Sequence, residues 1–508
     1  ILPQGKDYRV ISKGFMMADT LFPGQNPFEM GTSLLFGASP GSRDEALFSA
    51  SPEPGEYAVY LSWQRFPESC QQVKVTVHYS GGKDTLLVNQ RIGGGTWVYL
   101  GTYHFGPEEG HNPIEGGASS GADQPGKNLA TEGSVGIQGA GSAEHPEKKR
   151  AFGAVSVSLS GNTGEVISVD AVRLGGGMGN VARRLEGSVR PNQKSVNDGS
   201  APSGEAIPMD ASRFSWKTSG KSRYREGARY FLQYAGFPDT LVYSLNEGKN
   251  DYNDDYMARG EWVNYLIGRP AGPTKNRNAE GVGIPVDLAF AFHTDAGITP
   301  DDSVIGTLGI YSTWADKGLF PDGSSRMASR DLTDLIQTQI VDDIRTLYNP
   351  EWTRRALWDR QYSEAWRPNV PVMLLELLSH QNLADMRYGL DPRFRFDVSR
   401  AIYKGMLRFL AFREGRAYVV HPLPVSHFSL LQKEKGTLEL SWKPVTDPLE
   451  PTAIPTAYKV YRRCGDKGWD RGIEVSKPSL TLPLAANNSS CDYKITALND
   501  GGESFPGE

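Results

Sequence analysis

Residues 370–378 read Val-Pro-Val-Met-Leu-Leu-Glu-Leu-Leu, an apolar run that contains one carboxylate, that of Glu376. Such a run is typical of a strand that is covered on both faces. Segments with apolar residues at helical spacing lie on either side, at 332–347 and at 398–410. This alternation predicts an α/β domain over residues 221–415. Within it we also expect helices at 224–235 and 255–267 and strands at 240–244, 286–292 and 306–311.

The residues before this domain follow a period of two. Short alternating segments occur at 57–63, 73–79, 85–90, 96–105, 154–159 and 166–174, with a hairpin turn at Gly81-Gly82. Their spacing predicts an antiparallel β-sandwich over residues 46–177. We expect an irregular lead-in at 1–45, a mobile insertion at 107–149, where Gly, Ser, Glu and Ala dominate, and a polar linker at 178–220.

Residues 422–508 return to strands, and the segments 438–442, 458–462 and 493–497 are spaced as in a fibronectin type III module. Trp442 is expected to fill its core. In that topology the third and sixth strands are antiparallel neighbours, so Cys464, just past one, should approach Cys491, just before the other. We predict a disulfide, which would favour an oxidising compartment; the alternative is two unpaired thiols.

The composition excludes several classes of protein. Of the 508 residues, 38% are hydrophobic and 22% are charged, which is the ordinary globular range. A net charge of -5 gives no basic footprint for nucleic acid, and no apolar run is long enough to span a bilayer. The chain begins at Ile1 without a methionine, so we expect it to be trimmed. The oligomeric state is not predicted.

His293 and Asp295 follow the apolar strand predicted at 286–292. In open α/β sheets ligands bind beyond the carboxyl ends of the strands, where these side chains would project. A neutral imidazole suits a zinc ion, and Asp295 would orient it through a hydrogen bond. The alternative is that His293 only caps its strand.

Glu376 is the second candidate, because a carboxylate within an apolar strand is costly unless it is paired, protonated or bound to a metal. Burial raises the pKa of such a group, which suits a general base near neutral pH. The alternative is an ion pair with a buried arginine such as Arg400. His380, which follows the strand, either binds substrate or anchors its loop.

The acidic segment 250–256 precedes a predicted helix, so one of its aspartates is expected to cap that helix. Its spacing does not match an EF-hand. Arg259 and Glu261, on the same helix, either line the cleft or lie on a solvated face. The sequence contains no HExxH or Walker A motif.

The segments 226–230, 250–252, 292–297 and 375–382 together resemble a family of secreted bacterial proteins labelled xanthan lyase or N-acetylmuramoyl-L-alanine amidase-like. The segment Asp-Ala-Val-Arg-Leu-Gly-Gly-Gly at 170–177 resembles the end of the golvesin/xanthan-lyase carbohydrate-binding-like domain. The resemblance implies a secreted, periplasmic or cell-surface hydrolase that acts on peptidoglycan or another polysaccharide.

For the site, the resemblance implies a zinc ion with His293 as one ligand and Glu376 as the general base. The other ligands have no counterpart in this sequence and are expected upstream of residue 1. The zinc ion would polarise an amide carbonyl and lower the pKa of its bound water, while Glu376 takes the proton.

Two other functions stay open. A polysaccharide (xanthan-type) lyase needs a base and a group that neutralises a uronate carboxylate, and no ordered set of such residues is visible in the sequence. A non-catalytic surface glycan-binding protein with a degenerate hydrolase core would use aromatic side chains such as Trp63, Trp97 and Tyr99. Exposed rings would support that function, and buried rings would remove the support.

Overall fold

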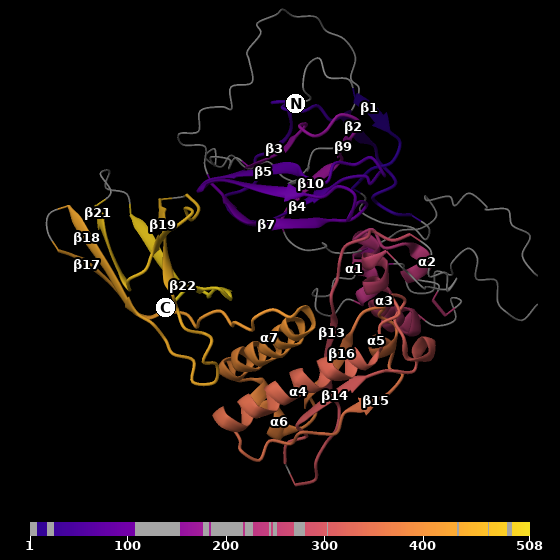
Figure 1. The fold of residues 1–508 in the computed structure, drawn as a ribbon, viewed down its shortest axis with the longest axis vertical. Coiled ribbons are helices and arrows are strands. Elements are labelled where there is room, and N and C mark those ends of the chain that lie inside the picture. The colour runs from indigo at the N-terminus through magenta and orange to yellow at the C-terminus, as the bar shows by residue number, and fades with distance from the viewer. Residues whose placement is uncertain are drawn as a thin grey trace, which may run out of the picture.

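The computed structural model describes residues 8–17, 25–106, 153–175, 182–183, 217–218, 227–242, 245–246, 251–268, 280–301, 303–433, 436–465, 467–484 and 490–507. The described residues form three modules: a β-sandwich, a module with helices packed on a small sheet, and a second β-sandwich (Figure 1). The predicted insertion at 107–149 lies outside the described residues. So does the linker at 178–220, apart from the two-residue strands β11 (Ala182–Arg183) and β12 (Lys217–Thr218), which pair with each other.

The first sandwich contains three sheets, with strand orders β1-β2-β9, β10-β4-β7 and β3-β8-β5-β6. Alternation builds its core: in β5, Val73, Val75 and Val77 are fully buried. The strands are β1 (Tyr8–Ile11), β2 (Ser33–Gly37), β3 (Glu45–Ala50), β4 (Gly55–Ser62), β5 (Val73–Tyr79), β6 (Gly82–Val88), β7 (Val98–Phe105), β8 (Gly153–Ser158), β9 (Val166–Val169) and β10 (Ala171–Leu174).

Two expectations for this module are wrong. The lead-in at 1–45 is not irregular throughout, because β2 lies there and pairs with both β1 and β9. These strands are too short to show a period. The single strand expected at 166–174 is split at Asp170, whose carboxylate accepts hydrogen bonds from the Phe15 amide and the Ser62 hydroxyl. As a result, β9 and β10 belong to different sheets.

The middle module has a four-stranded sheet of order β13-β16-β14-β15. The central strand β16 runs parallel to β13 and antiparallel to β14, which confirms the prediction of an apolar central strand. Its elements are α1 (Ala228–Tyr234), α2 (Asp239–Val242), α3 (Asp251–Ile267), β13 (Ala289–Asp295), β14 (Thr307–Tyr311), α4 (Met327–Leu347), β15 (Trp358–Asp359), α5 (Ser363–Trp366), β16 (Val372–Ser379), α6 (Leu383–Gly389) and α7 (Pro392–Glu414).

The strand expected at 240–244 is wrong, because α2 occupies that place. Pro238 begins the turn: its carbonyl accepts a hydrogen bond from the Leu241 amide. Leu241 and Val242 then bury their side chains in a small core with Phe237 and Leu232. Over so few residues an apolar pattern does not distinguish a helix from a strand.

The two faces of β16 have different neighbours. Met373, Leu375 and Leu377 belong to the main core together with the long helices α4 and α7. Leu374 belongs instead to a small core that includes Ala365 of α5. Since side chains alternate along a strand, Glu376 lies on the same face as Leu374, beneath α5.

The C-terminal module is a sandwich of two sheets, with orders β17-β18-β21 and β20-β19-β22-β23. Trp442 is buried in its core, as expected. The strands are β17 (Ser426–Gln432), β18 (Thr437–Lys443), β19 (Ala457–Cys464), β20 (Ile473–Val475), β21 (Ser479–Pro483), β22 (Cys491–Asn499) and β23 (Gly502–Glu503).

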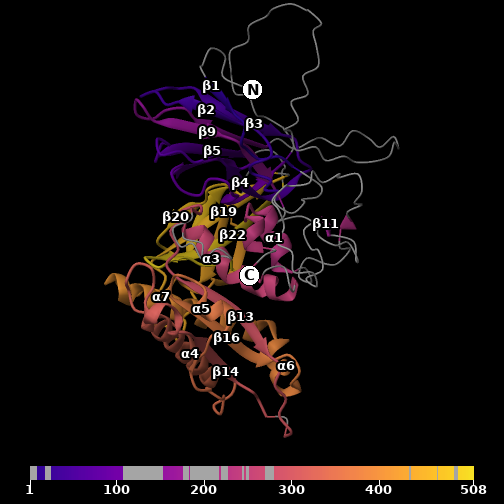
Figure 2. The same cartoon turned by 90° about the vertical axis from the view of Figure 1, so that its right-hand side faces the viewer.

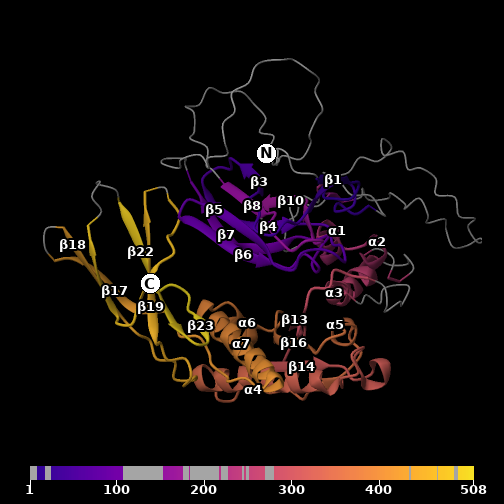
Figure 3. The ribbon, with the colours of Figure 1, turned by 45° about the horizontal axis from the view of Figure 1, so that its top comes forward.

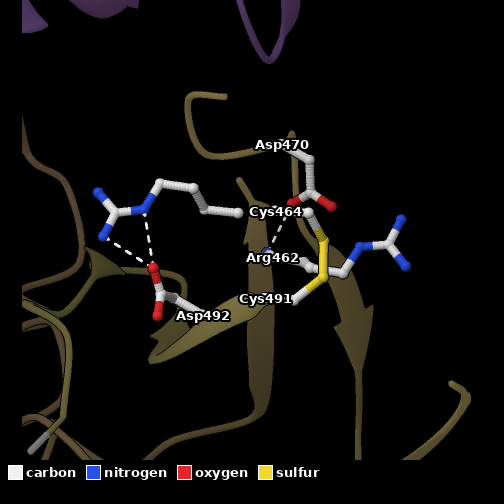
Figure 4. The surroundings of a disulfide bond; sticks show 6 residues. Arg462, Cys464, Asp470, Cys491 and Asp492 are labelled. Carbon is white, nitrogen blue, oxygen red and sulfur yellow. Dashed lines mark hydrogen bonds and ion pairs between the residues drawn. A yellow bond between two sulfur atoms is a disulfide. The ribbon is translucent and has the colours of Figure 1, made fainter. Parts of the chain in front are cut away.

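The predicted disulfide is present. Cys464 and Cys491 are directly paired on the antiparallel strands β19 and β22, with their Cα atoms 4.0 Å apart (Figure 4). Beside it, the Asp470 carboxylate accepts a hydrogen bond from the Arg462 amide at 3.0 Å. The disulfide thus joins two core strands, β19 and β22, at the base of the loop that carries Asp470.

Removing this disulfide is expected to destabilise the C-terminal module by about 3.5 kcal/mol, because the bridge closes a loop with a sequence separation of 27 and so restricts the unfolded chain. Hydrogen exchange of the β19 and β22 amides should accelerate in the double variant Cys464→Ser/Cys491→Ser. Adding a reductant to that variant is the control and should change nothing further. Equal protection with and without the bridge would contradict the expectation.

The three modules contact one another in a closed ring. The first sandwich reaches the helices through the Thr96 hydroxyl, which donates to the Ala235 carbonyl at 2.8 Å. Helix α7 joins the C-terminal module through Arg400 and Asp447. The ring closes where Arg471 meets Asp84 at 3.0 Å. Figure 3 shows the three modules around a common centre, and in Figure 2 the first sandwich lies above the other two.

In the part of the chain that the structure describes, no helix is both long and apolar enough to cross a membrane.

Candidate functional site

His293 and Glu376 occupy paired positions on the adjacent parallel strands β13 and β16. A location at opposite ends of the sheet would have excluded a shared role, and the register places them side by side. Leu308 of β14 is the partner of Glu376 on its other side. The two candidate residues therefore share one face of the sheet, although their chemical roles stay predictions.

An irregularity in the strands follows the two residues directly. The register between β13 and β16 shifts after His293, so that Asp295 pairs with Ser379. Leu378 accommodates the shift with a φ of 63°, a conformation that is uncommon for a side chain of its size. Bulges of this kind redirect side chains at the end of a strand, and here the bulge separates the environment of Asp295 from that of His293.

Glu376 is partly buried, and burial is the largest influence that raises the pKa of its carboxyl; the positive charges of His293 and Arg355 act in the opposite direction. Its Oε2 atom is buried and has no hydrogen-bond partner among the described residues. The alternative that Glu376 pairs with Arg400 is wrong, because Arg400 donates to Asp447 at 2.9 Å. These features are compatible with the predicted general base, a role that stays a prediction.

The His293 imidazole binds a carboxylate that the sequence did not single out. Its Nε2 atom lies 2.9 Å from Oε2 of Glu364, the second residue of α5. This hydrogen bond is the main cause of a raised pKa for His293, and burial acts against it. His293 therefore does more than cap its own strand.

Asp295 does not orient His293 as predicted. Its Oδ2 atom accepts a hydrogen bond from Arg355, and its Oδ1 atom accepts from the Ala296 and Gly297 amides. Burial alone would raise the pKa of Asp295, but these donors hold it below its ordinary value. The bulge explains why Asp295 does not contact His293: it turns Asp295 towards Arg355, while His293 binds Glu364.

Arg259 of α3 reaches the site indirectly. Its guanidinium lies 3.5 Å from Glu364 and 3.0 Å from Asp255, so it holds the carboxylate that binds His293. Glu261 does not line the site and is not solvated either, because it is buried against Arg367 at 2.8 Å. The ion pair between Arg367 and Glu261 attaches the end of α5 to α3.

His380 anchors the loop after β16. Its Nδ1 atom lies 3.1 Å from the Thr294 hydroxyl, and its amide donates to the Asp295 carbonyl at 3.1 Å. Of the two alternatives for this residue, loop anchoring is the one that these contacts support.

Glu364 and Arg355 are the two site residues that sequence reasoning missed. Glu364 lies in a helix of four residues, too short for any periodic signal, and Arg355 lies in an irregular segment before β15. Both reach the site across the fold: 71 residues separate His293 from Glu364, and 60 separate Asp295 from Arg355. No local pattern reports such contacts.

The donors present do not by themselves make a zinc site. An imidazole with neighbouring carboxylates is a suitable type of donor set. Among the described residues, however, no group of three or more His, Cys, Asp or Glu side chains is placed to hold a metal ion. In the acidic segment 250–256, Asp255 is engaged by Arg259 and Asp254 accepts from the Asn246 amide. Zinc binding through His293 would need ligands from outside the described residues.

The three aromatic residues proposed for sugar binding do not form one exposed patch. Trp63 is only 2% exposed, and its indole donates to the Gln90 carbonyl. Trp97 packs against Phe15 at a ring distance of 4.5 Å. Tyr99 alone is well exposed, at 55%. The support that Trp63 gave to a glycan-binding function is therefore removed.

Replacing Glu364 by Gln is expected to lower the pKa of His293, because the hydrogen bond to this carboxylate is the main cause of its raised value. In the native protein the pair stabilises the fold below the unfolded-state pKa of histidine, about 6.5, and this contribution is lost as the pH rises through the higher folded-state pKa. Imidazole NMR shifts followed against pH measure the change. Glu474→Gln, on the exposed strand β20, is the control. An unchanged titration of His293 would contradict the assignment.

Comparison with known families supports part of the resemblance. Residues 25–115 match the family described as the Golvesin C-terminal domain. A xanthan lyase from Bacillus sp. (strain GL1) is 35% identical over 68 residues, which is 13% of this chain and 7% of that protein. The chain thus covers a small part of this relative's length. The golvesin match begins at residue 25, within the expected lead-in, and includes β2.

Solved structures with local similarity include two kinds of enzyme. A xanthan lyase from Paenibacillus is 20% identical, with 33% of this chain and 11% of that one covered and a TM-score of 0.21. The CwlD amidase from Clostridioides difficile is 18% identical, with 33% and 67% covered and a TM-score of 0.23. An N-acetylmuramyl-L-alanine amidase from Mycobacterium smegmatis is 19% identical, with 31% and 61% covered and a TM-score of 0.23. TM-scores this low carry no weight for function.

Proposed function

We propose that this chain acts on cell-wall or polysaccharide material as a hydrolase of the N-acetylmuramoyl-L-alanine amidase type, with Glu376 as its general base. The observation that carries the proposal is the environment of Glu376. Its carboxyl is held partly buried on a central strand beside His293, burial raises its pKa, and one of its oxygens has no protein partner among the described residues.

In this proposal Glu376 takes a proton from the water that attacks the amide carbonyl and passes it to the leaving amine. Arg259 holds Glu364, and Glu364 fixes the orientation of the His293 imidazole on the same face of the sheet. Zinc remains part of the proposal through His293, whose imidazole is a suitable ligand, together with ligands outside the described residues.

A second candidate, a polysaccharide lyase, is favoured by Arg355. A lyase base removes the proton next to a uronate carboxylate and a carbon–carbon double bond forms. The C–O bond to the neighbouring sugar breaks, and the leaving oxygen takes up a proton to become a hydroxyl. The reaction needs a cation near the base to neutralise the carboxylate. Arg355 binds Asp295 on β13, the strand next to that of Glu376, and its charge lowers the pKa of the Glu376 carboxyl.

The third candidate is a non-catalytic surface protein. The strand order of the C-terminal sandwich agrees with a fibronectin type III module, an architecture shared by many cell-surface domains. Its disulfide suits a secreted, periplasmic or cell-surface location. Tyr99 is the one proposed sugar-stacking residue that stays exposed. This candidate requires binding of glycan without turnover.

One digestion experiment separates the three candidates. The full chain is incubated with muropeptides and with xanthan, with and without Zn²⁺. New free amines from muropeptides support the amidase, and ultraviolet-absorbing unsaturated sugars from xanthan support the lyase. Binding without any new product supports the third candidate. Turnover that persists in Glu376→Gln, with Glu474→Gln as the matched control, would overturn the role of Glu376 whichever substrate is used.

A further inference from the structure

Arg355 is held in a fixed position next to Asp295 of β13, the strand that pairs with the strand of Glu376. Its amide donates to the Thr307 carbonyl at 2.9 Å, and its own carbonyl accepts from the Gln337 side chain at 2.9 Å. Both partners are buried, on β14 and α4. The backbone from which this guanidinium extends is therefore attached to the core of the module.

The guanidinium itself is oriented by two neighbours. It donates one hydrogen bond to Asp295 and lies over the Trp358 ring, 5.6 Å from its centroid. Asp295 cannot turn away, because the Ala296 and Gly297 amides hold its other oxygen. A guanidinium held in this way loses little conformational freedom when it binds a further partner.

This arginine also keeps the capacity to bind a ligand. Its side chain is 24% exposed, and among the described residues its hydrogen-bond acceptor is Asp295 through a single nitrogen. An arginine has five N–H donors, and its planar geometry matches a carboxylate. Asp295 shares its negative charge among three donors, so it neutralises Arg355 only in part. The Trp358 ring is 36% exposed and offers apolar surface to the carbon atoms next to such a carboxylate.

We propose that Arg355, supported by Asp295 and Trp358, binds a carboxylate of the substrate, so that the site selects acidic polymers. This inference rests on the proposed function, since it takes Glu376 as the reacting group. The carboxylate has two possible sources, a uronate of a polysaccharide or an acidic residue of a peptide stem. Arg355 is then a binding residue, and Asp295 and Trp358 position it.

The test measures binding without turnover, in the Glu376→Gln background. The probes are a glucuronate-containing oligosaccharide and its carboxyl-reduced form, and a muropeptide with free or amidated carboxylates. We expect one acidic probe to bind at least about tenfold more tightly than its neutral form. Which pair shows the difference identifies the source of the carboxylate. Equal binding of the acidic and neutral forms in both pairs, or no binding of either acidic probe, would overturn the proposal.

Variants assign the preference to Arg355. Arg355→Met should remove the discrimination and leave binding of the neutral probe unchanged. Arg355→Lys, which keeps the charge and loses the planar geometry, should retain part of it. The matched control is Arg354→Met: Arg354 is the adjacent residue, 30% exposed, and pairs with Asp334 of α4 at 2.6 Å instead of with the site. Full discrimination in Arg355→Met, or equal loss in Arg354→Met, would refute the assignment.

The proposal and the proposed function fail in different ways. If Glu376→Gln retains activity while Arg355 still selects acidic probes, the base assignment is wrong and the carboxylate site stands. If Glu376→Gln is inactive and acidic and neutral probes bind alike, the base stands and the carboxylate site is wrong.

Discussion

Replacing Glu376 by Gln is expected to lower turnover by about 10²–10⁴-fold, the usual contribution of a general base. The amide keeps the shape of the side chain but cannot accept a proton. The fall should appear in kcat more than in KM, because the proton is transferred only in the transition state. Steady-state kinetics on whichever substrate is turned over provides the measurement.

The pH profile of the native protein should agree with this assignment. Because burial raises the pKa of Glu376, activity is expected to fall on the acidic side at a higher pH than for an ordinary glutamate. The same burial disfavours the ionised carboxylate of Glu376 in the folded state. The contribution of Glu376 to stability therefore decreases as the pH rises from its unfolded-state pKa through its raised folded-state pKa.

Glu376→Gln should therefore be at least as stable as the native protein at neutral pH while it is inactive. Glu474→Gln, an exposed glutamate of the C-terminal module, should change neither property. Loss of activity together with loss of thermal stability in Glu376→Gln would indicate a structural role and contradict the assignment.

Replacing Lys404 by Met is expected to destabilise the middle module by about 3–5 kcal/mol, the cost of leaving a buried charge without its partner. Lys404 of α7 lies 2.6 Å from Asp343 of α4, and its side chain is 2% exposed. Gln339 would remain as a neutral donor to Asp343, at 2.9 Å. Urea denaturation, or hydrogen exchange of the α4 and α7 amides, measures the loss.

Two variants isolate the cause of this effect. Adding Asp343→Asn to Lys404→Met removes the buried charge and keeps an oxygen for Gln339, so it should recover part of the stability. Lys443→Met, at an exposed position of β18, should stay within about 0.5 kcal/mol of the native protein. A Lys404→Met variant as stable as Lys443→Met would show that the pair contributes nothing.

Periodicity in the sequence was sufficient for most of the fold. The period of two predicted β5 without error at either end, and the helical stripes predicted α4 and α7. It failed for the four-residue helix α2 and the short strands β1 and β2. Elements of this length contain too few residues to establish a period, so a proline or a pairing partner elsewhere in the chain determines their conformation.

For the candidate site, the sequence alone identified the polar side chains that lie within or next to apolar segments. A carboxylate in one apolar run and a histidine directly after another are local features, and they marked Glu376 and His293. The strand expected at 286–292 is β13, which extends through His293 to Asp295. The cysteines were also readable, because strand order in a familiar topology relates Cys464 to Cys491.

Only the tertiary structure decided which groups those side chains meet. After the bulge that follows His293, Asp295 binds Arg355, whereas His293 binds Glu364. Each of these contacts joins residues at least 60 positions apart, on elements with no shared period. A sequence pattern reports neighbours along the chain, whereas the partner of a charged group is set by the folding of distant segments against the same face of a sheet.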